Sequence, residues 1–79
     1  MFFYTYILKS KKDGNLYIGF TSDLKKRITE HNNKKVEATK NRVPLELVYY
    51  EACRCQKKAV KRERYFKTGF GRRFLKNRI

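Results

Sequence analysis

The fold is decided by residues 4–31, which read YTYILKSKKDGNLYIGFTSDLKKRITEH. Aromatic and β-branched residues dominate residues 2–8 and 16–20, which predicts two strands. Between them, residues 11–15 supply Asp, Gly and Asn, which tolerate the backbone angles of a chain reversal. The stretch therefore predicts a β-hairpin at the start of the chain.

The length of the hairpin loop decides which side chains share a face. A loop over Lys11–Gly14 pairs Tyr6 with Gly19 and places Tyr6 and Tyr17 on one face, because side chains alternate along a strand. A loop with an odd number of residues places the two tyrosines on opposite faces. Gly19 in mid-strand indicates either a bulge or close approach of another group, or a packing accommodation. The residues alone leave both questions open.

The helix that follows carries polar side chains on its apolar face. It is predicted over residues 24–33, with Leu24 and Ile28 in its apolar stripe. Arg27 and His31 lie three and seven positions after Leu24, on the same stripe. A simple surface helix would keep such side chains on the opposite face, so we interpret both as functional.

The second half of the chain adds a strand and two helices. A basic segment leads to Leu45–Cys53, a mostly apolar run that predicts a buried or central strand. A helix is predicted from Gln56 to about Lys67, then a break at Gly69–Gly71 and a short helix over Arg72–Arg78. The order β-β-α-β-α-α predicts one domain over residues 1–79, of the α/β class in its α+β form. A small three-stranded antiparallel sheet is flanked by the helices.

Glu63 is an acidic residue within an apolar stripe. Ala59, Glu63, Phe66 and Phe70 follow one another at spacings of 4, 3 and 4, on one face of the second helix. A carboxylate that faces a core is costly unless a cation or metal accompanies it. The alternative, an i,i+4 ion pair with Lys67, contributes only about 0.3–0.5 kcal/mol and needs no inward position. We therefore favour a functional role for Glu63.

Composition indicates a polyanionic partner. The chain has 21 Lys and Arg against 7 Asp and Glu, a formal charge of +14, which favours nucleic acid. There is no run of 18 apolar residues and no cleavable leader, and the cations are not confined to one amphipathic helix. We expect a cytoplasmic protein without a membrane role or an obligate protein partner. Cys53 and Cys55 are predicted to be reduced thiols, because their spacing suits neither a disulfide nor a zinc site.

The inward polar residues form a suitable set for phosphodiester hydrolysis. Glu63 can hold Mg²⁺, which often takes only one or two protein carboxylates and polarises a phosphate. Arg27 can stabilise the transition-state anion with a forked hydrogen bond. A hairpin tyrosine or His31 can accept the proton of an attacking water.

At these residues the sequence resembles the GIY-YIG nuclease superfamily, specifically its small single-domain members. Tyr17-Ile18-Gly19 matches the second half of the motif. Tyr4-Thr5-Tyr6 keeps the final Tyr of the first half, while its Gly and Ile are replaced. The spacing of the halves, and of Arg27, His31 and Glu63 after them, also fits, so the resemblance spans nearly the whole chain.

The resemblance implies roles residue by residue. Tyr6 and Tyr17 correspond to the paired active-site tyrosines, one of them a candidate general base. Arg27 corresponds to the phosphate-stabilising arginine, and Glu63 to the single ligand of Mg²⁺ or Mn²⁺. His31 corresponds to a helix histidine near the site.

These features predict a metal-dependent DNA endonuclease of low sequence specificity, selective for branched or single-stranded DNA and acting in DNA repair or recombination. The alternative is a non-catalytic nucleic-acid-binding module of the same fold, which would not need the inward residues. Asn77 corresponds to a late asparagine of the family, or is a plain terminal surface residue. Eight basic residues are expected to contact backbone phosphates: Lys25, Lys26, Lys34, Lys35, Lys40, Arg42, Arg62 and Lys67.

Overall fold

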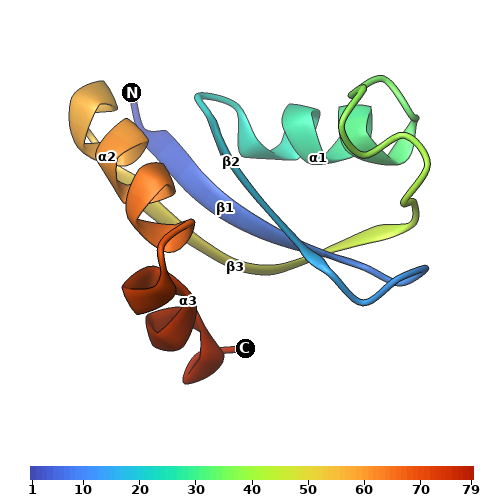
Figure 1. The fold of residues 1–79 in the computed structure, drawn as a ribbon. Helices are drawn as coiled ribbons and strands as arrows, with labels where there is room; N and C mark the ends of the chain where they lie inside the picture. Colours follow the sequence, from blue (N-terminus) through green and yellow to red (C-terminus); the bar gives the residue numbers. More distant parts are fainter.

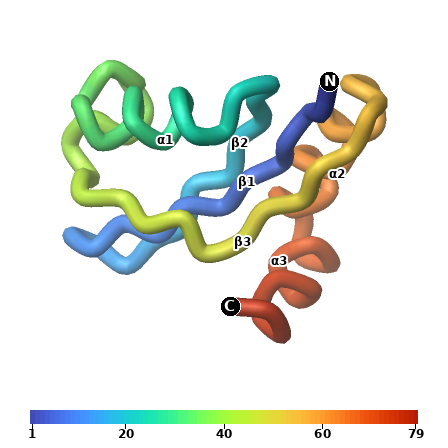
Figure 2. Tube along the Cα trace, turned by 180° about the vertical axis from the view of Figure 1, so that it is seen from behind, coloured from blue at the N-terminus to red at the C-terminus, as the bar shows by residue number.

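The computed structural model describes all 79 residues and contains one three-stranded antiparallel sheet and three helices. The elements are β1 (Phe3–Ser10), β2 (Leu16–Thr21), α1 (Leu24–Asn32), β3 (Leu45–Cys53), α2 (Gln56–Phe66) and α3 (Gly69–Lys76). The helix α1 covers one face of the sheet, and α2 and α3 pack on the other side (Figures 1 and 2). The predicted fold class and order of elements are confirmed.

The central strand is β1, because the order in the sheet is β2-β1-β3. Its residues 5–8 are all buried, as expected of a strand covered on both faces. The prediction of a buried or central position for β3 is wrong: β3 is an edge strand, and Glu46, Tyr50 and Ala52 are exposed on it. A mostly apolar run indicates a strand but does not say which strands flank it.

The hairpin has the even register. The Ser10 amide donates to the Asn15 carbonyl at 3.0 Å, and Tyr6 pairs with Gly19. Gly14 closes the loop with a φ of 75°, in the left-handed region that favours glycine. Tyr6 and Tyr17 therefore share the face that α1 covers.

Side-chain alternation along β1 produces two separate cores. The core under α1 contains Tyr6, Leu8 and Leu45, with Leu24 and Ile28 of α1 packed on it. The core under α2 and α3 has four buried residues, Ile7, Ile18, Phe66 and Leu75. Each helical layer is thus held by its own set of apolar contacts.

The two ends of α1 are fixed by polar side chains. Asp23 caps the N-terminus by accepting a hydrogen bond of 3.1 Å from the Lys26 amide. At the other end, Asn32 accepts from the Leu45 amide at 2.8 Å and donates to the Leu45 carbonyl at 3.1 Å. These bonds tie α1 to the start of β3 and hold Arg27 and His31 over the sheet.

The break between α2 and α3 lies before the glycines. The helix α3 begins at Gly69, and the Thr68 hydroxyl caps it by accepting from the Gly71 amide at 3.1 Å. The predicted break at Gly69–Gly71 is therefore wrong, because the cap starts a new turn at once. Phe70 is 71% exposed and does not continue the stripe of α2, which corrects a second expectation.

Gly71 allows α2 and α3 to pack closely. A Cβ at this position would overlap the Tyr65 carbonyl oxygen and lie 2.6 Å from Phe66 Cα. We expect Gly71→Ala to lower the free energy of unfolding by about 1–3 kcal/mol, the typical cost of overpacking. Thermal denaturation followed by circular dichroism measures this. Gly69→Ala is the matched control, because a Cβ there meets open space; equal effects of both substitutions would refute the packing argument.

Arg62 anchors α2 to β3. Its guanidinium donates to both Glu51 oxygens at 2.8 and 3.1 Å and lies 4.9, 4.6 and 4.8 Å from the ring centroids of Tyr65, Phe66 and Phe74. A guanidinium bound in this way is not free to contact phosphate. The sequence-based assignment of Arg62 to DNA binding is therefore corrected to a structural role.

None of the helices could cross a membrane: the longest has 11 residues, and none combines the length and apolar character that a bilayer requires.

Candidate active site

Three rings meet on the α1 face of the hairpin. The Tyr6 hydroxyl lies 2.8 Å from His31 Nε2. The ring centroids of Tyr17 and His31 are 5.0 Å apart, and those of Tyr6 and Tyr17 are 6.4 Å apart. The even loop of the hairpin and the inward face of α1 thus bring these three side chains together.

Gly19 makes room for the phenol of Tyr6. A Cβ at Gly19 would overlap the Tyr6 hydroxyl and ring carbons. The register of β1 with β2 is regular at this point, and the irregularity of the sheet lies between Ile7 and Leu8 on the β3 side. Of the alternatives left open above, close approach of a packed side chain explains the glycine, and a bulge does not.

His31 is enclosed by protein. It is 0% exposed, and its Nδ1 lies 2.7 Å from the Thr39 hydroxyl. The pKa of His31 is lowered to about 4, first by burial and then by the positive charge of Arg27, so the ring is neutral near pH 7. Because both ring nitrogens are engaged and water cannot reach them, the expectation that His31 accepts a proton from water is corrected. His31 is a positioning residue for Tyr6.

Arg27 connects this cluster to the surface. Its guanidinium donates to Glu30 at 3.2 Å, and its positive charge acts on the Tyr6 phenol, where it opposes the rise in pKa that burial causes. The neutral His31 ring donates from one nitrogen and accepts at the other. It therefore links the Tyr6 hydroxyl to the Thr39 hydroxyl in one buried chain of hydrogen bonds, with Arg27 at its outer end.

Tyr6 is deeply held within the cluster. It is 1% exposed. Burial raises the pKa of the Tyr6 phenol above its ordinary value, and the nearby Arg27 opposes this only partly. Tyr17 is only partly buried. Tyr17 is therefore the more accessible of the two hydroxyl-bearing rings.

Glu63 approaches from α2. Its side chain is 23% exposed, and its Oε2 accepts from Lys67 Nζ at 3.2 Å. Its charge is among the smaller influences that raise the pKa of Tyr6, so Glu63 lies within electrostatic range of that phenol. The i,i+4 pair with Lys67, which the sequence offered as the alternative, is present, and the carboxylate is also partly enclosed. The functional role of Glu63 stays a prediction.

The Glu63 carboxylate fits a magnesium-type ligand. One of its oxygens, Oε1, has no hydrogen-bond partner in the protein. No group of three or more His, Cys, Asp or Glu side chains is assembled anywhere in the structure. A single carboxylate with a free oxygen suits Mg²⁺ or Mn²⁺, which retain waters, and does not suit zinc.

The remaining predicted residues divide by their contacts. Asn77 lies at the C-terminal cap of α3, exposed, and makes no contact with the cluster, which leaves it outside the site. Arg42 donates to Asp13 at 3.0 Å and ties the basic segment to the hairpin loop, and Lys40 pairs with Glu37 at 3.0 Å. Four lysines predicted to contact phosphate are exposed and form no ion pair: Lys25, Lys26, Lys34 and Lys35.

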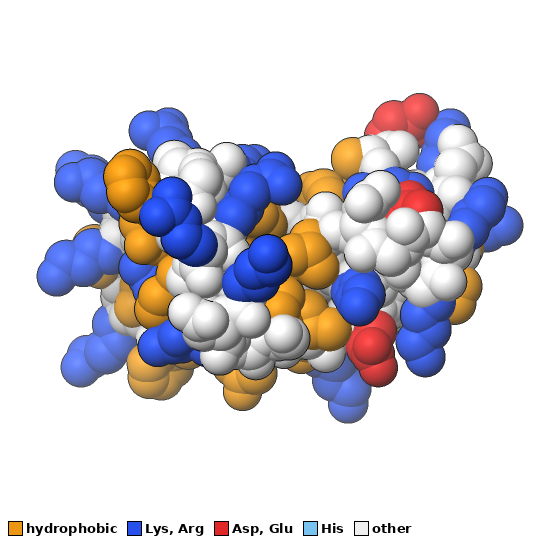
Figure 3. Space-filling model, turned by 60° about the horizontal axis from the view of Figure 1, so that its bottom comes forward, with side chains coloured by type: hydrophobic (Ala, Val, Ile, Leu, Met, Phe, Trp, Pro, Cys, Tyr) orange, Lys and Arg blue, Asp and Glu red, His pale blue; other side chains and the backbone are white.

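A broad basic surface covers α2 and α3. Figure 3 shows Lys and Arg side chains over this part of the molecule, with the acidic side chains in view confined to the other end. From Arg54 to the C-terminus, Glu63 is the only acidic residue. The exposed cations there, apart from Lys67, are Arg54, Lys57, Lys58, Lys61, Arg64, Arg72, Arg73, Lys76 and Arg78.

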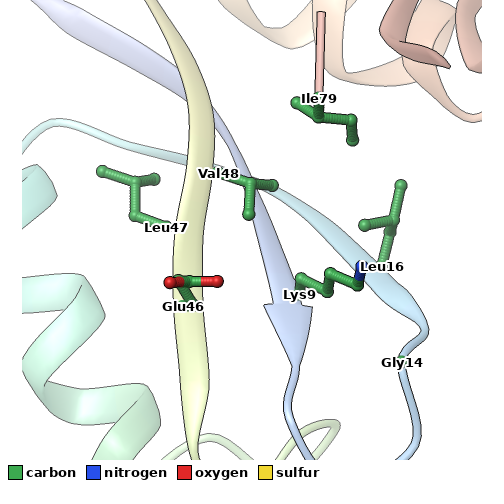
Figure 4. Close-up of a pocket in the computed structure, with 7 residues that line it drawn as sticks. All are labelled: Lys9, Gly14, Leu16, Glu46, Leu47, Val48 and Ile79. Atoms are coloured by element: carbon green, nitrogen blue, oxygen red, sulfur yellow. The ribbon is translucent and has the colours of Figure 1, made fainter.

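A hollow of about 530 Å³ on the other face of the sheet lacks comparable chemistry (Figure 4). Leu16, Val48 and Ile79 supply its apolar walls. Its charged residues, Lys9 and Glu46, are cross-strand neighbours. They have opposite charges, and none of the predicted site residues lines this hollow.

Sequence reasoning missed Thr39 and Glu30. Thr39 is fully buried, and its hydroxyl contacts Nδ1 of His31. It lies in a basic segment of turns, where only Val36, three positions earlier and also buried, hints at an inward side. Glu30 contacts Arg27 at i,i+3, a spacing that could have been noticed.

Acidification is expected to destabilise the fold through His31. The unfolded ring takes up a proton near pH 6.5 and the folded one only near pH 4. Unfolding is thus favoured as the pH falls through this window, by roughly 3 kcal/mol in total, and no further loss from this group follows below it. Urea denaturation at stepped pH measures the effect.

His31 is the single histidine of the chain, which makes a clean control possible. His31→Gln should be less stable at pH 7, yet should lose the dependence between pH 6.5 and 5, where carboxylates scarcely titrate. A wild-type stability that is flat across that range would contradict the buried, neutral ring.

The chain is similar to a protein family, to individual bacterial proteins and to a solved structure. A family model described as the GIY-YIG catalytic domain matches residues 2–77. A UPF0213 protein of Staphylococcus saprophyticus is 47% identical over 66 residues, which cover 82% of this chain and 79% of that protein. A UPF0213 protein of Bacillus pumilus is 44% identical over 66 residues, which cover 82% of this chain and 66% of that protein. The solution NMR structure of a UPF0213 protein from Bacillus halodurans has a TM-score of 0.61 and 32% identity, covering 98% of this chain and 84% of that one.

Proposed function

Because the chain belongs to the GIY-YIG catalytic-domain family, which is a family of nucleases, we propose that it is a divalent-metal-dependent DNA endonuclease. The observation that carries the proposal is the cluster in which the Tyr6 hydroxyl is held by His31 beside Tyr17, with the charge of Arg27 acting on the same phenol. Such a cluster presents a cation and phenols at one place, as phosphodiester hydrolysis requires.

The roles follow from accessibility. Arg27 binds a phosphate oxygen and stabilises the negative charge that develops on it. Tyr17 is the candidate general base, since it is less buried than Tyr6. It would act as the phenolate, having released its own proton to solvent before it takes the proton of the attacking water. Tyr6 is held by His31 and packs beside Tyr17, which fixes the position of that ring.

Glu63 would hold the Mg²⁺ or Mn²⁺ ion through its oxygen that has no protein partner. When bound, the metal would neutralise charge on the phosphate and lower the pKa of a bound water. The other oxygen of Glu63 accepts from Lys67 at 3.2 Å.

The substrate side of the proposal is DNA contacted mainly through its backbone. The cations over α2 and α3, with those of α1 and the segment after it, supply phosphate contacts and strong salt dependence. Because such contacts carry no sequence information, we assign low sequence specificity to the enzyme, and we propose a role in repair or recombination.

The test is a nicking assay on supercoiled, branched and single-stranded DNA with Mg²⁺, Mn²⁺ or EDTA. Metal-dependent cleavage of at least one substrate is expected, and EDTA should abolish it. Cleavage that is equal in EDTA would refute the metal, and no cleavage of any substrate would refute the nuclease.

A non-catalytic nucleic-acid-binding module is the second candidate. The burial of Tyr6 and the pairing of Glu63 with Lys67 favour it, because both groups have protein partners already. Binding of DNA with no cleavage under every metal condition would support this module.

A further inference from the structure

A groove beside the tyrosine cluster is lined by two aromatic side chains that belong to neither core, Tyr4 and Tyr50. It lies between α1 and β3 and has a volume of about 540 Å³. Its other walls are Leu47 of the sheet, Leu24, Lys25 and Ile28 of α1, and Ser22 and Asp23 just before α1. Asp23 is engaged as the cap of α1.

The two tyrosines of the groove are available to a ligand. Their ring centroids are 6.0 Å apart with an interplanar angle of 57°. Tyr50 is 50% exposed although it lies on a strand, and neither hydroxyl has a hydrogen-bond partner in the protein. An exposed large aromatic side chain in a groove is typical of a contact surface.

The sheet register places this pair next to the active site. Tyr50 is the direct partner of Tyr6 across the β1–β3 ladder, and neighbouring strands lie about 4.8 Å apart. Tyr4 precedes Tyr6 by two residues on the same face, or about 6.6 Å along the strand. Arg27 lines a separate hollow with Phe20 and Thr21, so the groove lies on the β3 side of the cluster and can take another segment of a bound strand.

The chemistry of the groove selects the occupant. Sites for single-stranded nucleic acid combine cations along the backbone with aromatic rings on which bases stack. Here Lys25 lies at the wall of the groove, in a chain of net charge +14. Bases stacked within a duplex cannot offer a free face to a tyrosine, whereas an unpaired base can.

We propose that the Tyr4–Tyr50 groove is a stacking subsite for an unpaired nucleotide of the bound DNA, beside the tyrosine cluster. This inference rests on the proposed function and deepens it, since it assigns the substrate class as DNA with a single-stranded or flapped segment. The subsite contributes affinity and selects structure, while the tyrosine cluster and Glu63 carry the reaction.

The chain contains no Trp, so Tyr50→Trp introduces a single fluorescent reporter into the groove. Titration in EDTA, where cleavage does not occur, uses three probes: a short oligothymidylate, an abasic oligomer of equal length, and a blunt duplex. Saturable quenching by the oligothymidylate alone is expected. Equal quenching by the abasic oligomer or by the duplex would overturn the proposal.

Affinity measurements with unlabelled variants complete the test. Tyr50→Ala should weaken oligothymidylate binding about tenfold, the typical effect of one stacked base, and should leave duplex binding unchanged. Tyr50→Phe should bind like wild type because the ring remains. Phe70→Ala removes an exposed ring on α3 and is the matched control; a loss equal to that of Tyr50→Ala, or no loss for Tyr50→Ala, would refute the subsite.

Binding in EDTA separates this proposal from the proposed function. Base-dependent quenching in a protein that cuts no DNA would retain the subsite and refute the nuclease. Cleavage without base-dependent quenching would retain the nuclease and refute the subsite.

Discussion

Glu63→Gln is expected to lower metal-dependent DNA cleavage about 10³-fold or more. A bound divalent ion supplies several kcal/mol of transition-state stabilisation, and about 1.4 kcal/mol corresponds to a tenfold rate change. Glutamine keeps the shape of the side chain but removes the charge that would hold the ion. The fold should be unaffected, because the pair with Lys67 contributes only about 0.3–0.5 kcal/mol.

Two control substitutions distinguish loss of the metal ligand from a general change in the charge of the protein. Glu46→Gln removes an exposed acid on the β3 edge and should cleave at the wild-type rate. Lys67→Gln removes the protein partner of Glu63 and should retain metal-dependent cleavage. The measurement is the rate of plasmid nicking at saturating Mg²⁺. Wild-type activity in Glu63→Gln would contradict its assignment as the metal ligand.

The hairpin and α1 could be predicted because their signals are local. Turn residues over 11–15 set the loop, and strand alternation then fixes which residues share a face. The position of β3 at the edge could not be predicted, because it depends on long-range pairing with β1. Likewise, the start of α3 at Gly69 depends on the cap that Thr68 forms, and glycines alone suggested a break.

For the site, periodicity identified which residues face inward but not what they touch. Arg27 and His31 could be found because they interrupt an apolar stripe. The role of His31 depends on Thr39, which a loop without regular periodicity brings to its second nitrogen. Arg62 looked like one more surface cation, and only the packed structure shows that Glu51 and three rings hold it.

Arg27→Ala is expected to lower cleavage about 10²–10³-fold, the usual effect of removing one preorganised donor to a developing anion. Its guanidinium is held by Glu30 at 3.2 Å on the face of α1 that turns toward the tyrosine cluster, so its position is restricted before a substrate binds. Arg27→Lys keeps the charge without the forked donors and should recover only part of the rate. Single-turnover cleavage with saturating enzyme measures the chemical step apart from DNA affinity.

The control for Arg27 is its neighbour on the helix. Lys26 is exposed, and we assign it only to backbone phosphate binding. Lys26→Ala should therefore weaken binding in a salt-dependent manner and leave the single-turnover rate unchanged. Arg27→Ala should do the reverse, with little change in affinity and a large loss of rate. Since the two residues are adjacent and carry the same charge, a similar effect of both substitutions would mean that Arg27 serves as one more surface cation, and the tyrosine cluster would lose its electrophilic group.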